Sequence, residues 1–249
     1  MKRLLAYVLS PLAVLLLWEG LSRGALIDTR FFPAPSAILG YLFSGEMHVW
    51  DDLRASLSRV FWGYSSGALA GVLAGTAMGL SRTVKTALYP LVALTYPIPK
   101  IALLPLIMLL FGIGELSKIV IVALGAFFLV MLSTLHGVST MARIYHDVAR
   151  VYRIRRRVFV TRVVLPGALP AIFTGLKLAI GYSLVVMVAA EFSGADAGIG
   201  YRIWQSWETF SIKAMYASIF VIGALGIAFT YALELLEIWL IPWKQEPPS

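Results

Sequence analysis

The sequence contains no cysteine, only three histidines and few charged side chains for its 249 residues. Without cysteine, the chain has no disulfide bond, no thiolate metal ligand and no thiol nucleophile. The histidines are His48, His136 and His146, and no two of them stand at metal-ligand spacing, so we expect neither a haem nor a zinc site. Charged residues make up 14% of the chain, against about 25% in an average soluble domain. These shortages exclude an ordinary soluble enzyme.

Hydrophobic residues are abundant instead, at 59% of the chain, where soluble domains have about 45–50%. This excess excludes disorder, which requires low hydrophobicity and high charge. It predicts an all-α membrane protein with several spans, because a helix satisfies its own backbone groups inside a bilayer. The net charge of +8 then indicates Lys and Arg in cytoplasmic loops and not nucleic-acid binding.

Six hydrophobic stretches approach the length of about 20 residues that a membrane-spanning helix needs. They are residues 4–21, 60–80, 87–111, 119–135, 170–190 and 214–241. The first stretch follows Lys2 and Arg3 and could be a signal peptide. A retained span is favoured, because no small-residue cleavage site follows and Trp18-Glu19 interrupts its end.

Two of the stretches carry unusual residues. The second has glycine at every fourth position, which places small residues on one helix stripe: Gly63, Gly67, Gly71, Gly75 and Gly79. Such a stripe lets two helices approach closely, either within the chain, which is favoured, or between two copies. The third contains Pro90, Pro97, Pro99 and Pro105, and prolines break helices. Lys100 beside this break indicates either a functional site or a lysine that snorkels to the headgroups.

Basic residues set the predicted orientation, since they collect in cytoplasmic loops. With a cytoplasmic N-terminus, the inner segments hold Lys2, Arg3, Arg82, Lys85, Arg143, Arg150, Arg153, Arg155, Arg156, Arg157, Arg162 and Lys244. The outer segments hold most of the acids: Asp28, Glu46, Asp51, Asp52, Glu115, Glu191, Asp196 and Glu208. Both termini are therefore predicted to be cytoplasmic.

The segment 140–169 is the only long connection on the predicted cytoplasmic side. Apolar side chains alternate there with arginines, which predicts two short amphipathic helices at the membrane surface. The arginines could attract anionic lipid, or the segment could dock onto a soluble partner. Periodicity does not separate these alternatives.

The twenty residues from Asp147 to Pro166 read DVARVYRIRRRVFVTRVVLP. This stretch resembles the EAA loop of permease subunits of ABC importers, which begins Glu-Ala-Ala, has glycine at its seventh position and ends in Leu-Pro. Ala149 and Leu165-Pro166 match, and Asp147 replaces Glu conservatively. Arg153 stands at the glycine position and departs from the pattern.

Further segments resemble the nitrate/sulfonate/taurine branch of that family. They are Phe32-Pro33-Ala34-Pro35-Ser36, residues 96–119 (YPIPKIALLPLIMLLFGIGELSKI), residues 166–170 (PGALP), and Ala190-Glu191-Phe192 followed by Gly198-Ile199-Gly200-Tyr201. Their order along six predicted spans makes the resemblance specific.

The resemblance implies a type I ABC importer permease fold without catalytic residues. It implies a homodimer or heterodimer of permeases, two cytoplasmic ATPases, an extracytoplasmic substrate-binding protein and a bacterial inner membrane. ATP and Mg would be bound by the ATPases and no cofactor by this chain, which has no Gly-x-x-x-x-Gly-Lys-Ser/Thr loop. Residues 1–58 would form the first span and an external segment, residues 59–241 a five-helix core with the coupling loop 140–169, and residues 242–249 a cytoplasmic tail.

Candidate site residues follow from the resemblance and the broken helix. The residues expected to contact the ATPase are Asp147, Val148, Ala149, Val151, Tyr152, Arg153, Arg156, Phe159, Leu165 and Pro166. Those expected along the translocation path are Tyr96, Pro97, Pro99, Lys100 and Glu191. For Glu191 we expect pairing with Lys118 or Arg202, contact with the binding protein, or a purely structural role.

The resembling branch suggests a small anion such as a sulfonate, taurine or nitrate, and related importers suggest a vitamin precursor or an aromatic acid. An ion-coupled secondary transporter is the alternative of another class. It would need acids inside the spans, whereas Glu19, Glu234 and Glu237 lie near span ends. An intramembrane enzyme would need a nucleophile–base pair, and the spans contain none.

Overall fold

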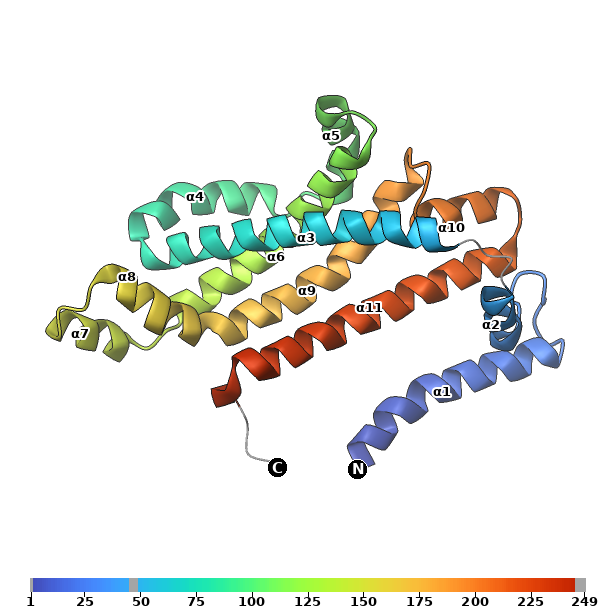
Figure 1. Ribbon diagram of the computed structural model, residues 1–249, viewed down its shortest axis with the longest axis horizontal. Coiled ribbons are helices and arrows are strands. Elements are labelled where there is room, and N and C mark those ends of the chain that lie inside the picture. The colour runs from blue at the N-terminus through green and yellow to red at the C-terminus, as the bar shows by residue number, and fades with distance from the viewer. Residues whose placement is uncertain (1, 45–48, 245–249) are drawn as a thin grey trace.

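The computed structural model describes residues 2–44 and 49–244, and in this part of the chain every regular element is helical (Figure 1). Glu46 and His48, which the sequence analysis names, lie outside the described residues. The longer helices are α1 (Lys2–Arg23), α3 (Val49–Leu80), α4 (Arg82–Thr95), α6 (Glu115–Ser139), α9 (Leu165–Phe192) and α11 (Ile212–Leu240). The shorter ones are α2 (Pro35–Phe43), η1 (Lys100–Leu103), α5 (Leu104–Phe111), α7 (Arg143–Val151), α8 (Arg156–Phe159), η2 (Val160–Val164), α10 (Ile199–Glu208) and η3 (Pro242–Lys244).

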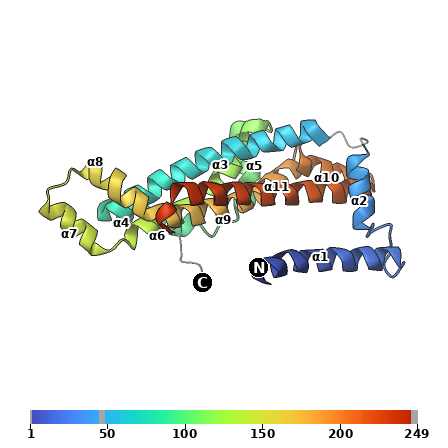
Figure 2. The ribbon, with the colours of Figure 1, turned by 60° about the horizontal axis from the view of Figure 1, so that its bottom comes forward.

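The centre of the molecule is the bundle of α3, α6 and α9, with α11 running alongside (Figure 1). Its largest apolar cluster joins α3, α5, α6 and α9 through residues such as Val60, Ile107, Ile121 and Met187. Helix α1 lies apart from this bundle in both ribbon views and is connected to it through α2 (Figures 1 and 2). Toward its end, α1 reaches α11, where the ring of Trp18 lies 5.4 Å from that of Tyr216.

The glycine stripe of α3 faces α6 of the same chain. A Cβ built on Gly67 would lie 2.2 Å from the carbonyl oxygen of Ala123, and one on Gly75 would lie 2.5 Å from that of Met131. Both distances are far below van der Waals contact, so only glycine permits this approach. The predicted packing role is confirmed, and the alternative of a stripe between two copies is wrong.

The predicted spans are recovered in part. Among the described residues, three helical stretches are long and apolar enough to cross a membrane: Glu115–Ser139, Arg156–Phe192 and Ile212–Leu240. Arg82–Thr95 and Lys100–Phe111 would form a fourth if this pair, bent by 88°, is one span. The break at the Pro97–Pro99 segment is therefore confirmed, and its sharpness follows from the two prolines, which remove backbone donors.

Two short helices, α7 and α8, lie between α6 and α9, as the pattern of apolar residues and arginines predicts. They project beyond the end of the bundle (Figure 1). A π-helical turn, η2, joins α8 to α9. At the other end of the molecule lie α2 and α10, two helices that the sequence analysis does not anticipate.

Candidate functional site

The turn between α7 and α8 keeps the geometry that a glycine would normally provide. The amide of Ile154 donates to the carbonyl of Ala149 at 2.9 Å, and the amide of Arg153 donates to that of Arg150 at 3.2 Å. This pair of bonds is a Schellman ending, in which the residue after the cap takes a left-handed conformation. Arg153 is that residue, with φ of 52°. The departure from glycine thus leaves the tight turn in place.

Most predicted coupling residues stand on the surface of this helical hairpin. Val151 is 78% exposed and Tyr152 76% exposed, and the exposed Asp147 and Val148 lie one helical turn earlier. Arg153 and Arg156 are exposed as well. The hairpin therefore presents an apolar tip between charged side chains.

Four predicted coupling residues are turned toward the chain itself. Ala149, Leu165 and Pro166 are half-buried, and Ala149 packs against an apolar cluster formed with Val138, Val164, Ala168 and Ile172. Phe159 is a buried member of that cluster, at 8% exposure. The expectation that its ring is available for docking is wrong, because the ring anchors α8 against α6 and α9.

Four of the five predicted path residues line one cavity of about 430 Å³. Tyr96, Pro97, Pro99 and Lys100 border it from the break between α4 and η1. The opposite wall is formed by Gly125, Phe128 and Leu129 of α6 and Tyr182 of α9. The structure thus joins the broken segment to two helices that are distant in sequence.

Lys100 is only 4% exposed and does not snorkel. Its Nζ donates to the carbonyl oxygens of Thr95 at 2.7 Å, Ile98 at 3.1 Å and Tyr96 at 3.2 Å. It also lies 4.0 Å from the centre of the Phe128 ring, within cation–π range. The snorkelling alternative is contradicted, because the ammonium turns inward to the carbonyls that the break frees.

Glu191 does not line this cavity and is fully buried. Its carboxylate accepts hydrogen bonds from Arg59 Nη1 at 2.6 Å, Ser56 Oγ at 2.7 Å and the amide of Gly200 at 2.7 Å. The expected pairing with Lys118 or Arg202 is wrong, and burial also removes Glu191 from contact with a binding protein. Its structural role is the one that the geometry supports.

The two alternative partners are engaged elsewhere. Lys118 Nζ donates to the carbonyls of Ile113, Gly194 and Gly114. Arg202 forms an ion pair with Asp52. Together with the Glu191 cluster, these contacts join α3, α6, α9 and α10 at one end of the bundle.

Glycines place α10 on the Glu191 carboxylate. A Cβ on Gly198 would lie 2.5 Å from the carboxyl carbon of Glu191, and Gly198 has φ of 132°. The amides of Gly198 and Ile199 at the start of α10 donate to Asp52 and Ser56. The resembling segments 190–192 and 198–201 therefore form one buried cluster.

Arg59 is the important residue that sequence reasoning missed, because the second hydrophobic stretch is predicted to begin only at residue 60 and residues up to 58 are expected to be external. In the structure it is 2% exposed and binds both Glu191 and Glu115. A signal existed, since Asp52, Ser56 and Arg59 continue the glycine stripe of α3 at helical spacing.

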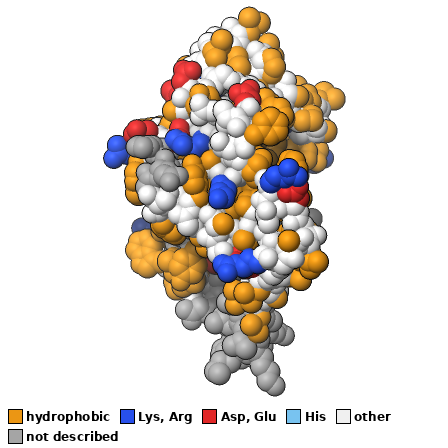
Figure 3. Space-filling view, turned by 90° about the vertical axis from the view of Figure 1, so that its right-hand side faces the viewer, with side chains coloured by type: hydrophobic (Ala, Val, Ile, Leu, Met, Phe, Trp, Pro, Cys, Tyr) orange, Lys and Arg blue, Asp and Glu red, His pale blue; other side chains and the backbone are white. Residues whose placement is uncertain are grey.

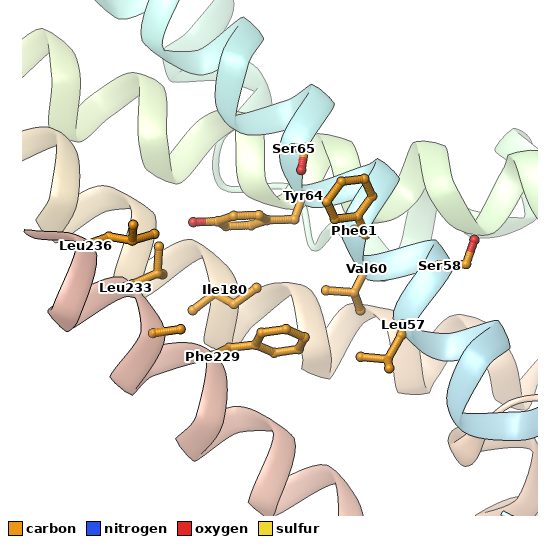
Figure 4. A pocket seen from close by; sticks show the side chains of 11 residues that line it. Leu57, Ser58, Val60, Phe61, Tyr64, Ser65, Ile180, Phe229, Leu233 and Leu236 are labelled. Atoms are coloured by element: carbon orange, nitrogen blue, oxygen red, sulfur yellow. The ribbon is translucent and has the colours of Figure 1, made fainter. Parts of the chain in front are cut away.

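A second cavity of about 550 Å³ lies between α3, α9 and α11 (Figure 4). Apolar side chains such as Phe61, Ile180, Phe229 and Leu233 point into it (Figure 4). The residues that line it carry no formal charge. This second cavity is therefore suited to an apolar ligand or a lipid chain and not to an ion.

The end of the molecule that carries α2 and α10 is chemically mixed. Figure 3 shows basic and acidic side chains scattered among hydrophobic ones on that face. Local ion pairs join Arg30 with Asp28 and Arg23 with Glu19 at the end of α1 and in the loop after it. Within the described residues, no cluster of His, Asp or Glu is suited to hold a metal ion.

Comparisons with known proteins agree with the fold. Residues 67–244 match the family described as "Binding-protein-dependent transport system inner membrane component". The chain is 35% identical to the taurine transport system permease protein of Escherichia coli K12, over 99% of this chain and 92% of that protein. It is 30% identical to a putative aliphatic sulfonates transport permease protein of Bacillus subtilis 168, over 95% and 87%.

A bicarbonate transport system permease protein of Synechococcus elongatus is 33% identical, over 77% of this chain and 69% of that protein. Among solved structures, the MetNI methionine ABC transporter in inward-facing conformations matches with a TM-score of 0.57 and 22% identity. That match covers 77% of this chain and 94% of the other, and it bears on the fold alone.

Proposed function

This chain belongs to the family of binding-protein-dependent transport system inner membrane components, and from that premise we propose that it forms the path for a small sulfonate such as taurine. As a member, it is a non-catalytic permease subunit of an ABC importer, and ATP hydrolysis belongs to a partner ATPase. The proposals below concern the solute that crosses the membrane through this subunit and the contact through which the ATPase drives transport.

One observation carries the choice of solute. The similarity to the taurine permease extends over 99% of this chain, so it includes the broken segment and the cavity beside it. The other relatives named above handle aliphatic sulfonates and bicarbonate, which are also small anions. A sulfonate is therefore the solute class that this chain serves. A vitamin precursor and an aromatic acid are the competing solutes within the same machinery.

The proposed topology has six crossings with both termini in the cytoplasm of a bacterial inner membrane. The crossings are α1, α3, the bent pair α4–α5, α6, α9 and α11. The arrangement supports this, because α1 begins and α11 ends on the side toward which α7 and α8 project (Figure 1). The arginines of the hairpin then face the cytoplasm, as the positive-inside rule requires.

The proposed assembly contains two permease subunits, two ATPases that bind ATP and Mg, and a substrate-binding protein outside. The α7–α8 hairpin is the proposed ATPase contact, since its tip is the most exposed apolar feature at that end. Exposed ion pairs contribute only about 0–1 kcal/mol each. The apolar side chains of Val148, Val151 and Tyr152 are therefore proposed to supply most of the docking energy, and the arginines the orientation.

The decisive experiment is reconstitution. The chain is co-expressed with an ABC ATPase and a substrate-binding protein from the same genome, and ATP-driven uptake of radiolabelled taurine is measured in proteoliposomes. Uptake that needs ATP and the binding protein, and that is competed by excess alkanesulfonate but not by thiamine precursors or benzoate, supports the proposal. Competition by one of the latter instead would assign the other solute class.

A further inference from the structure

We propose that the cavity beside the break is a subsite for the anionic group of the transported solute, with Lys100 as its fixed positive charge. The inference rests on the proposed function, because it names where an importer of small anions holds its cargo. The cavity is lined by Tyr96, Lys100, Gly125, Phe128 and Tyr182 among others.

The charge of Lys100 is held in place but not neutralised. Three carbonyl oxygens accept its three ammonium hydrogens, and carbonyl groups carry no net charge. Among the residues that the structure describes, no carboxylate forms an ion pair with Lys100, whereas Arg59, Lys177 and Arg202 each pair with at least one. A full positive charge therefore remains at the cavity wall, where the surrounding medium screens it less than water does.

Lys118 provides an internal comparison. Among the residues whose burial the structure describes, it is the other lysine that is almost fully buried, at 2% exposure, and carbonyl oxygens also hold its ammonium. However, Lys118 stands one helical turn from Glu115 and belongs to the charge cluster in which Arg59 pairs with Glu115 and Glu191, so carboxylates lie among its neighbours. Lys100 differs because its surroundings are carbonyls and the Phe128 ring.

The shape of the cavity fits a small solute. Its volume of about 430 Å³ lies within the usual range of about 300–1,000 Å³ for ligand pockets. Gly125 keeps it open, since a Cβ there would lie 3.1 Å from the Tyr182 ring. Tyr96 and Ile98, 46% and 41% exposed, form an accessible rim. The aromatic faces would accept the non-anionic part of the solute, including an amine.

The absence of native cysteine permits a direct test of this charge, because a single introduced cysteine is the only thiol. Ile98→Cys places a thiol at the rim of the cavity. Leu26→Cys, at a 75% exposed position in the loop after α1, serves as the reference, because its neighbours Arg30 and Asp28 form an ion pair. Each variant is reacted with sulfonatoethyl and trimethylammonioethyl methanethiosulfonate, and the ratio of the two rates is compared.

If the charge of Lys100 is uncompensated, the anionic reagent is favoured at Ile98→Cys. The ratio of the anionic to the cationic reaction rate is then expected to be at least about threefold higher there than at Leu26→Cys. Equal ratios at the two positions would overturn the proposal, and so would a failure of both reagents to reach Ile98→Cys. Millimolar taurine is expected to slow reaction at Ile98→Cys and to leave Leu26→Cys unchanged.

A second set of variants assigns the effect to Lys100. In the Ile98→Cys background, Lys100→Met is expected to lower the ratio to that of Leu26→Cys, and Lys100→Arg to preserve it. Lys85→Met removes an exposed lysine of α4 and is expected to change nothing. A ratio that survives Lys100→Met contradicts the proposal. If Lys100→Met does not fold, the comparison of Ile98→Cys with Leu26→Cys still decides.

These measurements need no ATPase and no transport, so their failure differs from failure of the proposed function. A wild-type complex without ATP-driven sulfonate uptake would refute the function and leave the charge measurement standing. If the wild type takes up sulfonate but the ratio of anionic to cationic reaction is the same at Ile98→Cys and Leu26→Cys, the subsite alone is refuted.

Discussion

Arg153 adopts the left-handed backbone conformation that residues other than glycine, Asn and Asp usually avoid. The hydrogen bonds of the Schellman ending and the burial of Phe159 hold it there. Ala25 and Phe210 occupy the equivalent position after α1 and α10, each with φ of 53°. Single residues in this chain thus keep turn geometry at a conformational cost.

Arg153→Gly is expected to relieve that cost and to stabilise the α7–α8 turn by about 1 kcal/mol. Hydrogen exchange at the Ile154 amide would slow about fivefold, which corresponds to the same free energy. Arg150→Gly is the matched control, because it puts glycine at an exposed position in the last turn of α7 and should destabilise the helix by up to about 1 kcal/mol. Faster exchange in Arg153→Gly would show that the turn is not limited by this backbone strain.

The Arg59–Glu191 pair is the other residue-scale feature with a measurable consequence. Arg59→Met leaves the Glu191 carboxylate buried without its charge partner, which costs about 3–5 kcal/mol in comparable sites. Arg54→Met changes an exposed arginine of the same helix and should stay within about 0.5 kcal/mol. Thermal unfolding of both variants in detergent provides the comparison. A similar melting temperature for the two would contradict a stabilising role for the cluster.

At the scale of elements, α3 and α6 form the closest pair in the bundle. Gly67 and Gly75 place backbone against backbone, and the apolar clusters on either side continue the contact. Lys177 of α9 and Glu237 of α11 add an ion pair between two further helices. Close packing thus joins α3 with α6, whereas no residue in the most apolar stretch of α11 is fully buried.

Gly67→Ala is expected to force α3 and α6 apart and to destabilise the fold by about 1–3 kcal/mol, the usual cost of overpacking. Gly181→Ala is its control, because Gly181 of α9 has no atom within 4 Å of a built Cβ. That substitution should be neutral or slightly stabilising, since alanine favours helix more than glycine does. Equal stability of the two variants would mean that the stripe tolerates side chains.

The sequence predicted the elements that have strong internal periodicity. Glycine spacing predicted the contact of α3, proline spacing the break before η1, and the arginine pattern the α7–α8 hairpin. It failed where the outcome depends on partners distant in the chain. Glu191 and Arg59 are 132 positions apart in the sequence, and no local pattern predicts that they form an ion pair. Phe159 likewise looks like a surface residue of an amphipathic helix until α6 and α9 enclose it.

At the scale of the whole molecule, the hairpin tip is the surface through which force from an ATPase would enter. Tyr152→Ala and Val151→Ala together are expected to weaken ATPase association more than tenfold, because buried aromatic and apolar anchors dominate interfaces. Both side chains are more than three-quarters exposed, so their truncation should leave the fold intact. Pull-down titration against the ATPase that supports uptake in the reconstituted system measures the effect, with Leu26→Ala as the control. Undiminished association would move the contact elsewhere.

The six-crossing topology is tested by two single cysteines. Tyr152→Cys should react with an impermeant maleimide only after the inner face of membrane vesicles is opened, and Trp207→Cys only from the outer face. These positions lie in the α7–α8 turn and in α10, at opposite ends of the bundle (Figure 1). Labelling of both from one side would exclude this topology.

The glycine contact between α3 and α6 also has a mechanical consequence. Two helices packed this closely are expected to rotate together as one rigid rod. Motion must then be absorbed at the joints that flank the rod. The proline segment 96–99 and the link 140–142 before the hairpin are such joints, and alternating access would bend the chain there.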